Sequence, residues 1–517
     1  MSSEISSPRT PWFRAWAMTF FGLGMLGCSE RETQWELTYV PDALESQASS
    51  VLVEIRSGSC TGPSVFRSDL ASGAASPVLE PGSYGFFARA SDSSCRWFAS
   101  GCEERTLPLD EAERIAVTLT AEPEADRCPG ACDQGRCTNE NDGSTDGMNP
   151  PGERRGIEVA AGRAHSCARV RSTDEVYCWG LNETLQLGAI TNAVEQTTPV
   201  RVEGLSGAVA IAVGGNGQPK DGHSCAIVAG GGVRCWGDNL VGQHGTGSAG
   251  APRAEPQMAM IQNARGIDGG RQHTCVLTTD SEVFCWGANE RAQTGATANQ
   301  GIATPHEVSA GGSLMRIATG NDHSCVSSGG GDVRCWGSNG NAQLGRDTPN
   351  SSEDPVTVQG LSNVASIALG EGYSCAVEMS GEVLCWGRNS NGVLGDPSFS
   401  GGASPQRVDL PERPVAEVAA GSDFACARFS AGDIYCWGSN QWGALGRGVD
   451  SSRSVSTPGP VLGIDNASDI SAGDNHVCAV TTDGRVRCWG RGQQGRLGNG
   501  DLEDKYEPTD VVGFGPQ

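Results

Sequence analysis

Short apolar runs alternate with polar residues along much of the chain, most clearly in residues 476–490, HVCAVTTDGRVRCWG. Two runs with apolar side chains at a period of two flank an Asp-Gly turn, which predicts a β-hairpin. Recognisable copies occur seven times between Ala161 and Gly490, at intervals of about fifty residues. A fixed period of this kind is typical of a propeller, a solenoid or an array.

Each copy contains two cysteines about ten residues apart, and Trp-Gly follows the second one. When the last copy is folded about Asp483, Cys478 lies opposite Cys488 on one face of the hairpin. Opposed Cα atoms in an antiparallel pair are roughly 4.5–5.5 Å apart, a separation that a disulfide accepts. We therefore expect seven cross-strand disulfides. Buried free thiols and metal sites are the other interpretations, although structural zinc needs four close ligands. The expected pairs are Cys167 with Cys178, Cys225 with Cys235, Cys275 with Cys285, Cys325 with Cys335, Cys375 with Cys385, Cys426 with Cys436, and Cys478 with Cys488.

A second recurrent element, roughly Pro-x-x-Val, lies between the hairpins, and a short run ending in Ala-x-Gly leads into each hairpin. One unit therefore has about four strands. The first hairpin has no Pro-x-x-Val element before it, and the last element, at Pro508, has no hairpin after it. This offset predicts a closed ring over residues 157–517, in which the C-terminal strand completes the first blade. Closure protects sheet edges, whereas an open solenoid would need polar capping repeats.

The region before the repeats has a different pattern. Non-repeating apolar alternation at residues 36–40, 51–57, 84–90 and 114–120 predicts strands of a small β-sandwich-like domain over residues 29–120. Trp97 in this region is expected in the core, with carbohydrate contact as the other interpretation.

Residues 121–156 are polar and rich in helix and strand breakers, so we expect a linker that contains cysteines. Asn139 and Asp142 lie in a stretch that superficially resembles a calcium loop, but the spacing departs from the full pattern. Six cysteines of this linker and the preceding domain have a connectivity that the sequence leaves open, with fifteen possibilities. They are Cys60, Cys95, Cys102, Cys128, Cys132 and Cys137.

The N-terminal residues 1–28 have the pattern of an export signal. Arg9 and Arg14 precede an apolar run that ends at Leu26, and polar residues follow Cys28. The end of the run resembles a bacterial lipobox, which implies cleavage before Cys28 and lipidation of its thiol. An uncleaved anchor and a disordered tail are the other interpretations, and the run is short for a transmembrane helix.

Charge and cysteine content narrow the functional classes. The formal net charge of −24 argues against binding of nucleic acid through phosphates, which requires a basic surface. The 21 cysteines, most of them in paired spacing, indicate an oxidising compartment.

The repeat consensus A-x-G-x-x-H-S-C-A, G-x-V-x-C-W-G-x-N and G-x-L-G resembles the repeat of the regulator of chromosome condensation family, over about 355 residues. The resemblance implies a seven-bladed β-propeller closed by strands from both termini. The founding member is an exchange factor for a small GTPase and binds chromatin. Neither role suits an acidic, exported chain with many disulfides, and the cysteine pairs depart from the eukaryotic pattern.

Residues that recur at one position in every blade are expected to be structural. Trp follows the second cysteine in all seven copies and is expected to pack between blades. His precedes Ser-Cys, Thr-Cys or Val-Cys in five copies, whereas Tyr373 and Phe424 replace it in two. A metal-binding or catalytic role would not tolerate Phe, so we expect a hydrogen-bonded turn role for this His. The Asn after Trp-Gly is expected to hold a turn.

We find no catalytic motif, no metal site and no cofactor site, so we expect a non-enzymatic scaffold. Its partner would be a protein or glycan, bound through the longest loops, at 181–198, 240–255, 290–304 and 447–457. Trp442 is a candidate anchor for the partner. We expect a monomer in the bacterial envelope or on the outer surface, attached to the membrane only by lipid. A glycan-active or other hydrolytic enzyme that uses the propeller channel, and a structural envelope component, are the competing hypotheses.

Overall fold

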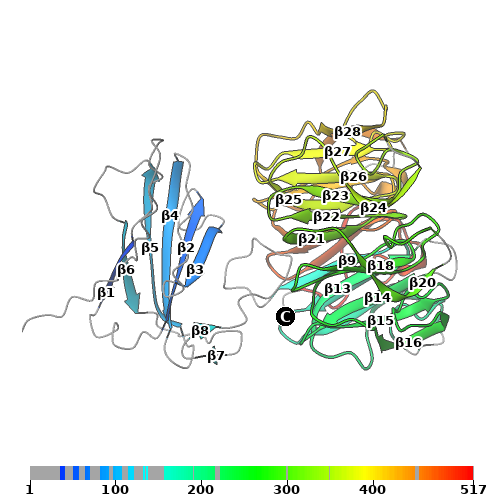
Figure 1. Ribbon diagram of the computed structural model, residues 1–517, viewed down its shortest axis with the longest axis horizontal. Coiled ribbons are helices and arrows are strands. Elements are labelled where there is room, and N and C mark those ends of the chain that lie inside the picture. The colour runs from blue at the N-terminus through cyan, green and yellow to red at the C-terminus, as the bar shows by residue number, and fades with distance from the viewer. Residues whose placement is uncertain are drawn as a thin grey trace, which may run out of the picture. The chain divides into compact units, whose positions relative to one another are not determined.

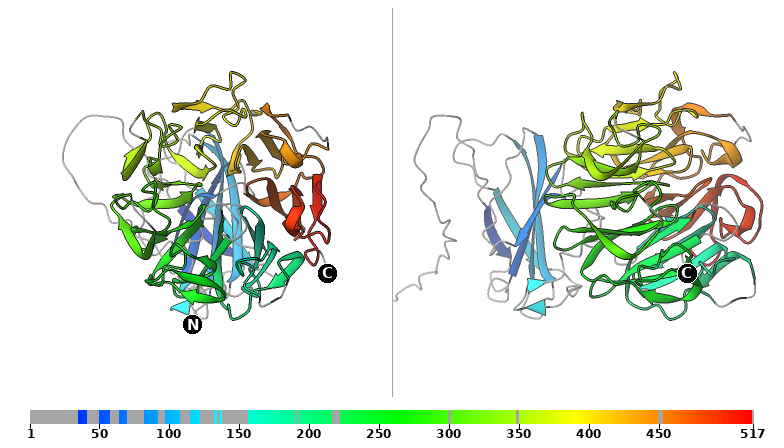
Figure 2. Two further views of the ribbon diagram at one scale, coloured as in Figure 1. Left: turned by 90° about the vertical axis from the view of Figure 1, so that its right-hand side faces the viewer. Right: turned by 45° about the vertical axis from the view of Figure 1, so that its right-hand side comes forward.

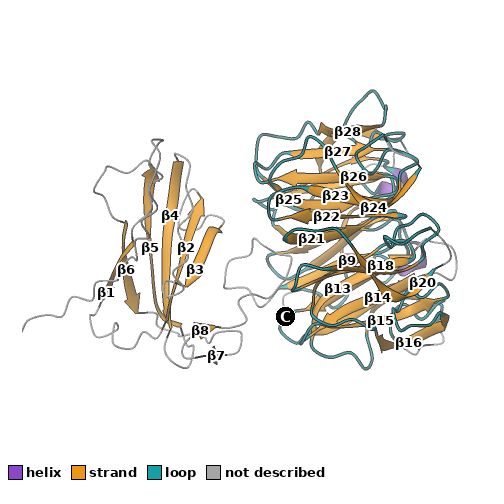
Figure 3. Ribbon diagram, in the orientation of Figure 1, coloured by secondary structure: helices purple, strands orange, loops and turns teal. Residues whose placement is uncertain are grey.

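The computed structural model divides into two compact units, Met1–Glu140 and Asn141–Gln517. It describes residues 156–515 except 190, 192, 216–221, 299–300, 348–349 and 449–452, and it describes the backbone of eight strands in the first unit. Strands make up nearly all of the regular structure in the described residues, together with two short 3-10 helices (Figure 3). No helix among these residues is both long enough and apolar enough to cross a bilayer.

The first unit contains one six-stranded sheet in the order β1-β6-β5-β4-β2-β3. Its strands are β1 (Trp35–Val40), β2 (Ser50–Ser57), β3 (Ser64–Asp69), β4 (Gly82–Ser91), β5 (Trp97–Leu107) and β6 (Ile115–Ala121). β1 and β6 pair in parallel, and the other pairs are antiparallel. The expected strands are present, but the second layer of the expected sandwich is not among the strands that the structure describes. A two-residue pair, β7 (Cys132–Asp133) with β8 (Arg136–Cys137), follows.

The second unit is a propeller of seven four-stranded sheets (Figure 1). The first three blades are β9 (Ile157–Ala161), β10 (His165–Val170), β11 (Glu175–Leu181) and β12 (Glu195–Arg201); β13 (Ala208–Gly215), β14 (Gly222–Val228), β15 (Gly232–Asn239) and β16 (Gly250–Met258); and β17 (Ala264–Gly269), β18 (His273–Thr278), β19 (Val283–Gly287) and β20 (Ile302–Val308). The fourth and fifth are β21 (Leu314–Thr319), β22 (His323–Ser328), β23 (Val333–Ser338) and β24 (Ser351–Thr357), then β25 (Val364–Leu369), β26 (Tyr373–Glu378), β27 (Val383–Gly387) and β28 (Gly402–Arg407). The last two are β29 (Val415–Ala420), β30 (Phe424–Phe429), β31 (Ile434–Gly438) and β32 (Val455–Pro460), then β33 (Ala467–Ala472), β34 (His476–Thr481), β35 (Val486–Gly490) and β36 (Lys505–Asp510).

Every blade is built from four consecutive strands, which corrects the expected mode of closure. The C-terminal strand β36 pairs with β35 of the seventh blade, and the first blade obtains its outer edge from β12, which contains Pro199. The Pro-x-x-Val element is therefore the outer strand that follows each hairpin. Proline suits an edge strand because its nitrogen has no proton to donate to a neighbour. The ring closes by packing of the last blade on the first, and Figure 2 shows these blades side by side (red and cyan).

The strand order assigns each loop to a face of the propeller. Within a blade the strands are antiparallel, so the Ala-x-Gly turn after the inner strand and the loop between the third and fourth strands lie at the same end. We call this end the loop face. The loops at 181–198, 240–255, 290–304 and 447–457 all join a third strand to a fourth, and they therefore share this face.

Candidate functional site

The inner strands of the seven blades surround a central channel with a cavity of about 300 Å³. Its lining includes Glu158, Asp268, Glu417, Asp469 and Asp474. A hydrolytic enzyme that used the channel would need carboxylates poised for acid and base chemistry. The bonding of these side chains therefore tests what the channel can do.

Carboxylates inside the channel connect neighbouring inner strands. Asp268 on β17 accepts hydrogen bonds from the backbone N–H of Thr319, at 2.7 Å, and from that of Gly269, at 2.9 Å. Burial raises the pKa of Asp268, although these hydrogen bonds oppose the shift. Glu158 accepts from Arg169 Nε at 2.7 Å and from the N–H of the second blade's Ile211 at 3.2 Å. These groups act as clamps between blades.

Asp469 makes the equivalent clamp where the ring closes. Its carboxylate accepts a hydrogen bond from Val159 N of the first blade at 3.0 Å. Two residues further along β33, the hydroxyl of Ser471 accepts one from Ala161 N at 2.9 Å. The last and first inner strands are thus joined by side chains instead of a shared sheet.

The channel mouth on the loop face is lined by ion pairs. Arg163 of the first blade pairs with Asp474 of the seventh. Arg388 pairs with Asp423 and lies 3.6 Å from Glu371. A similar pair joins Arg271 of the third blade to Asp322 of the fourth at 3.8 Å. Burial raises the pKa of Asp474, and Arg163 opposes the shift. These carboxylates have cationic partners, and the described residues contain no cluster of His, Cys, Asp and Glu suited to a metal ion.

The fourteen hairpin cysteines form the seven expected pairs as disulfides, with Cα–Cα distances of 4.0–4.2 Å. The spacing is shorter than expected for a reason visible in the last hairpin. Thr481 N donates to Arg485 O beside the turn, so the alternation of the ladder places Cys478 and Cys488 at a non-hydrogen-bonded pair. Such pairs have the closer Cα atoms.

Each disulfide packs against the Trp of the next blade. Cys275 and Cys285 share a core cluster with Trp336, and Cys478 and Cys488 share one with Trp179 across the ring closure. The seven tryptophans are at most 1% exposed, and each donates its indole N–H to a backbone carbonyl in the preceding blade. The expected packing role of this Trp therefore includes a hydrogen bond between blades.

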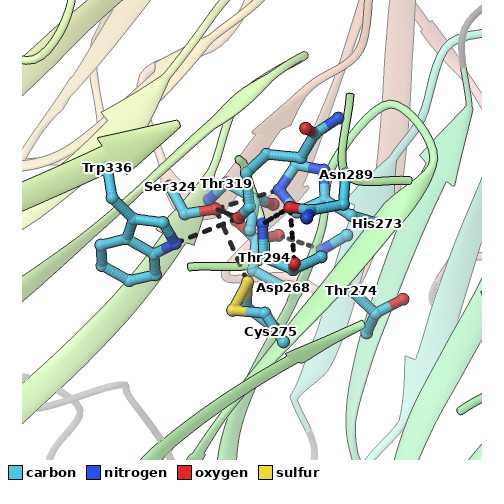
Figure 4. Close-up of a disulfide and its surroundings, with 12 residues drawn as sticks. Asp268, His273, Thr274, Cys275, Asn289, Thr294, Thr319, Ser324 and Trp336 are labelled. Carbon is cyan, nitrogen blue, oxygen red and sulfur yellow. Dashed lines mark hydrogen bonds between the residues drawn. A yellow bond between two sulfur atoms is a disulfide. The ribbon is translucent and has the colours of Figure 1, made fainter. Parts of the chain in front are cut away.

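The recurrent His links blades, which differs from the turn role expected for it. His273 Nε2 lies 3.0 Å from the Ser324 hydroxyl of the next blade, and that hydroxyl donates to Gln293 O at 3.1 Å (Figure 4). Because the hydroxyl of Ser324 donates its single proton to Gln293 O, it can only accept from His273. His273 is therefore the donor and carries its proton on Nε2. Burial lowers the pKa of His273 to about 3, so the ring is neutral near pH 7.

The same hydrogen bond from His to a hydroxyl of the next blade, which we call the imidazole–hydroxyl lock, occurs at five of the seven interfaces between blades. One of the five is the interface that closes the ring. The locks are His165 to Ser224, His223 to Thr274, His273 to Ser324, His323 to Ser374, and His476 to Ser166, at 2.7–3.0 Å. Two interfaces have no hydroxyl to receive an imidazole. Ala425 and Val477 stand where the other blades have Ser or Thr. Ala425 shares a core cluster with Tyr373 of the preceding blade, and Val477 shares one with Phe424. Loss of the acceptor is thus matched by loss of the His.

The Asn after Trp-Gly holds the loop as expected. In six blades its side-chain oxygen accepts the backbone N–H of the residue five positions later, and Asn339 with Leu344 N, at 3.0 Å, is one example. In the seventh blade Gly492 occupies this position. Its N–H donates to Asp504 instead, at 2.9 Å.

Trp442 differs from the seven packing tryptophans. It is half-buried, lies in the 3-10 helix η3 (Gln441–Gly443) on the loop face, and has a φ of 65°. The Arg491 guanidinium of the next blade lies 5.0 Å from its ring centre. The sequence indicated Trp442 as an extra aromatic residue, but no pattern along the chain indicated that Arg491 lies beside it.

Several predicted residues lie outside the residues whose side chains are described. They are Cys28, Cys60, Cys95, Cys102, Cys128, Cys132 and Cys137. Lipidation of Cys28 stays a prediction, and for the other six cysteines all fifteen connectivities stay open.

Solved structures share the propeller fold. Yeast RCC1 (Prp20), solved bound to Kap60, has a TM-score of 0.58 at 23% identity, covering 65% of this chain and 83% of that one. Human WBSCR16 has the same TM-score and identity, covering 65% of this chain and 94% of that one.

Curated relatives match over shorter stretches. The ultraviolet-B receptor UVR8 of Arabidopsis thaliana is 37% identical over 103 residues, which is 19% of this chain and 23% of the relative. The probable E3 ubiquitin-protein ligase HERC4 of Mus musculus is 34% identical over 97 residues, or 18% of this chain and 9% of the relative. The chain thus spans about a quarter or less of the length of these relatives.

Family models match most of the propeller. The RCC1-like domain matches residues 128–427, more than half of the chain. The regulator of chromosome condensation (RCC1) repeat matches residues 415–443 and 467–496 in one version, and 431–480 and 483–516 in another. With seven blades that carry this repeat, the chain belongs to the RCC1-like domain family.

Proposed function

We propose that the chain is a non-enzymatic, extracytoplasmic scaffold that binds a protein partner through the loop face of its propeller. The observation that carries the proposal is that, within each blade, the recurrent residues have structural roles whereas the variable residues lie in loops. The recurrent Cys, Trp and most of the His residues of the blades hold each blade together or bind it to the next one, and the variable loops lie together on one face. Loops displayed by a rigid scaffold are the usual location of binding residues.

The non-enzymatic part of the proposal draws on the channel. Its interior carboxylates bind backbone amides of the next blade, and those at the mouth pair with arginine. Groups engaged in this way stabilise the ring, and they are poorly placed to exchange protons with a substrate.

The location outside the cytoplasm draws on the disulfides and on the N-terminus. Seven disulfides suit an oxidising compartment, because cytosolic thiols are kept reduced. We extend the proposal to a bacterial protein that is attached to the envelope through lipid on Cys28. Metabolic labelling with an alkyne fatty acid should mark the wild-type chain and leave Cys28→Ser unmarked. A label that persists in Cys28→Ser would exclude this attachment.

Relatives with a similar propeller support a protein as the partner. One yeast structure is described as RCC1 bound to Kap60, and another is described by its binding to Gsp1p and histones. Those partners belong to the yeast protein. Given the net charge of −24 and the proposed location, we infer a different protein partner for this chain, and no nucleic acid.

Capture from native fractions tests the proposal. The full chain, exported and purified with its disulfides intact, is immobilised and exposed to envelope and culture fractions, and bound protein is identified by mass spectrometry. The control is the same chain after reduction and unfolding. We expect a protein enriched on the folded chain alone, and absence of any such protein would refute the scaffold hypothesis.

A further inference from the structure

Internal repetition allows the loops of the loop face to be compared with one another. In all seven loops, the residue three positions after the recurrent Asn, or after the Gly492 that replaces it, has a positive φ. In the sixth and seventh blades the preceding residue is left-handed as well, namely Trp442, with φ 65°, and Gln494, with φ 64°. These two loops form the 3-10 helices η3 and η4 (Gln493–Gly495). A left-handed conformation is unfavourable for a bulky residue such as Trp, and strain of this kind gathers at functional sites.

Departures from the repeat concentrate in the last three blades, which include these two. The residues that lack the imidazole–hydroxyl lock are Tyr373 in the fifth blade, Phe424 and Ala425 in the sixth, and Val477 in the seventh. Val393, Ala444 and Arg496 stand at a loop position where the first four blades have Gln. A chain that solves one packing problem in the same way in four blades and differently in the three that follow has a specialised region there.

Trp442 and Arg491 form an aromatic–cation pair at the centre of this region. Arg491 donates from Nε, at 3.2 Å, and from Nη2, at 2.5 Å, to Gln493 Oε1, and neither of these contacts uses its Nη1 group. In the part of the chain that the structure describes, Arg491 has no carboxylate within ion-pair distance. Its neighbour Arg496 is buried, and its guanidinium donates to neutral oxygens, including Arg163 O at 2.6 Å. Among the described residues, this part of an acidic chain therefore presents a cation without a carboxylate partner beside a partly exposed indole.

We propose that Trp442 and Arg491 are the centre of the partner-binding surface and that they receive an acidic side chain of the protein partner. This inference rests on the proposed scaffold function. The guanidinium would hold the carboxylate in a two-point hydrogen bond, and apolar atoms next to that carboxylate would lie on the indole. Trp and Arg are also the residue types enriched among those that dominate binding energy at protein interfaces.

The test uses the full chain and a printed array of short peptides, in which each Asp or Glu peptide has an Asn or Gln counterpart. We expect the wild-type chain to prefer the acidic peptides, and Arg491→Glu and Trp442→Ala each to weaken this binding by about tenfold or more. Arg491→Lys should recover part of it. Arg291→Glu is the matched control, because Arg291 is an exposed cation at the position of the third blade's loop that Trp442 occupies in the sixth.

The outcomes separate this inference from the proposed function. Equal binding of acidic and amide peptides, an equal loss in Arg291→Glu, or selective retention of an acidic glycan such as polygalacturonate would each overturn the inference. Circular dichroism and non-reducing mass spectrometry establish that the variants are folded and oxidised. If capture from envelope fractions still enriches a protein with the Trp442 and Arg491 variants, the scaffold function stands and only this site is wrong. If the wild-type chain captures no protein, the proposed function itself fails.

Discussion

The imidazole–hydroxyl lock between the third and fourth blades offers a sharp test of how the ring is held together. Ser324→Ala removes the acceptor of His273 and leaves a buried N–H without a partner, which should cost about 1–3 kcal/mol. His273→Phe removes the donor and leaves Ser324 bonded to Gln293, so we expect a smaller loss, of about 1 kcal/mol.

The double variant His273→Phe with Ser324→Ala combines two replacements that the chain already uses, Phe in place of the His at Phe424 and Ala in place of the hydroxyl residue at Ala425. Phe424 faces Val477 at the interface between the sixth and seventh blades. The space is also similar, because Gly270 lies against His273 as Gly421 lies against Phe424. The double variant should therefore lose less free energy of unfolding than the sum of the single variants, with a coupling of about 1–2 kcal/mol.

The pH dependence of the free energy of unfolding provides a second test of the same lock. The pKa of His273 is about 3 in the fold, against 6.5 for the unperturbed group. Below pH 6.5 the unfolded chain therefore binds a proton at this residue that the folded chain does not bind. The contribution of neutral His273 to the free energy of unfolding is thus complete above pH 6.5 and is lost as the pH falls toward 3. Between pH 7 and pH 5 the loss is about 2 kcal/mol for this residue, and the double variant should be spared it.

Unfolding of the full chain by guanidinium chloride, with disulfides intact, measures both the coupling and the acid sensitivity. It is carried out at pH 7 and pH 5 on the wild-type chain, the two single variants and the double variant. The four m-values should agree, so that shifts in midpoint report stability. Strict additivity, together with the same acid sensitivity in the double variant, would refute the assignment of His273 as a buried neutral donor.

Three further predictions concern other parts of the propeller. Replacing Cys275 and Cys285 by Ser should lower the free energy of unfolding by about 2–3 kcal/mol, measured by denaturant titration, because a loop of ten residues is released in the unfolded chain; an unchanged midpoint would contradict this. Acidification should destabilise the wild-type chain with uptake of up to five protons on unfolding, since burial lowers the pKa of all five lock histidines, and a flat stability curve between pH 6.5 and pH 5 would argue against it. Gly287→Ala should cost about 1–3 kcal/mol or more, as seen by thermal unfolding, because φ is 104° there and a Cβ would lie 2.4 Å from Gln272 O; tolerance of Ala would show that the turn relaxes.

The sequence by itself determined the hairpin, its cysteine pairing and the number of blades. The hairpin and its cysteine pairing depend on residues within about ten positions of one another, where the strand period and an Asp-Gly turn leave little freedom. The number of blades then follows from the number of hairpin copies. The Trp that follows each second cysteine was recognisable as packing for the same reason, since it repeats with the hairpin.

Only the tertiary structure decided how the blades join. The Pro-x-x-Val element lies between two hairpins, and local pattern permits pairing with either one, so the expected strand exchange at the ring closure was wrong. The partner of each lock His is a hydroxyl in another blade, 51–59 residues away in four locks and 310 away at the ring closure. The matching of Tyr373 with Ala425 likewise has meaning only once the interface is known. The left-handed Trp442 and its contact with Arg491 depend on the conformation of two loops from neighbouring blades. Contacts between distant segments are set by how the blades pack in three dimensions, which no periodicity along the chain records.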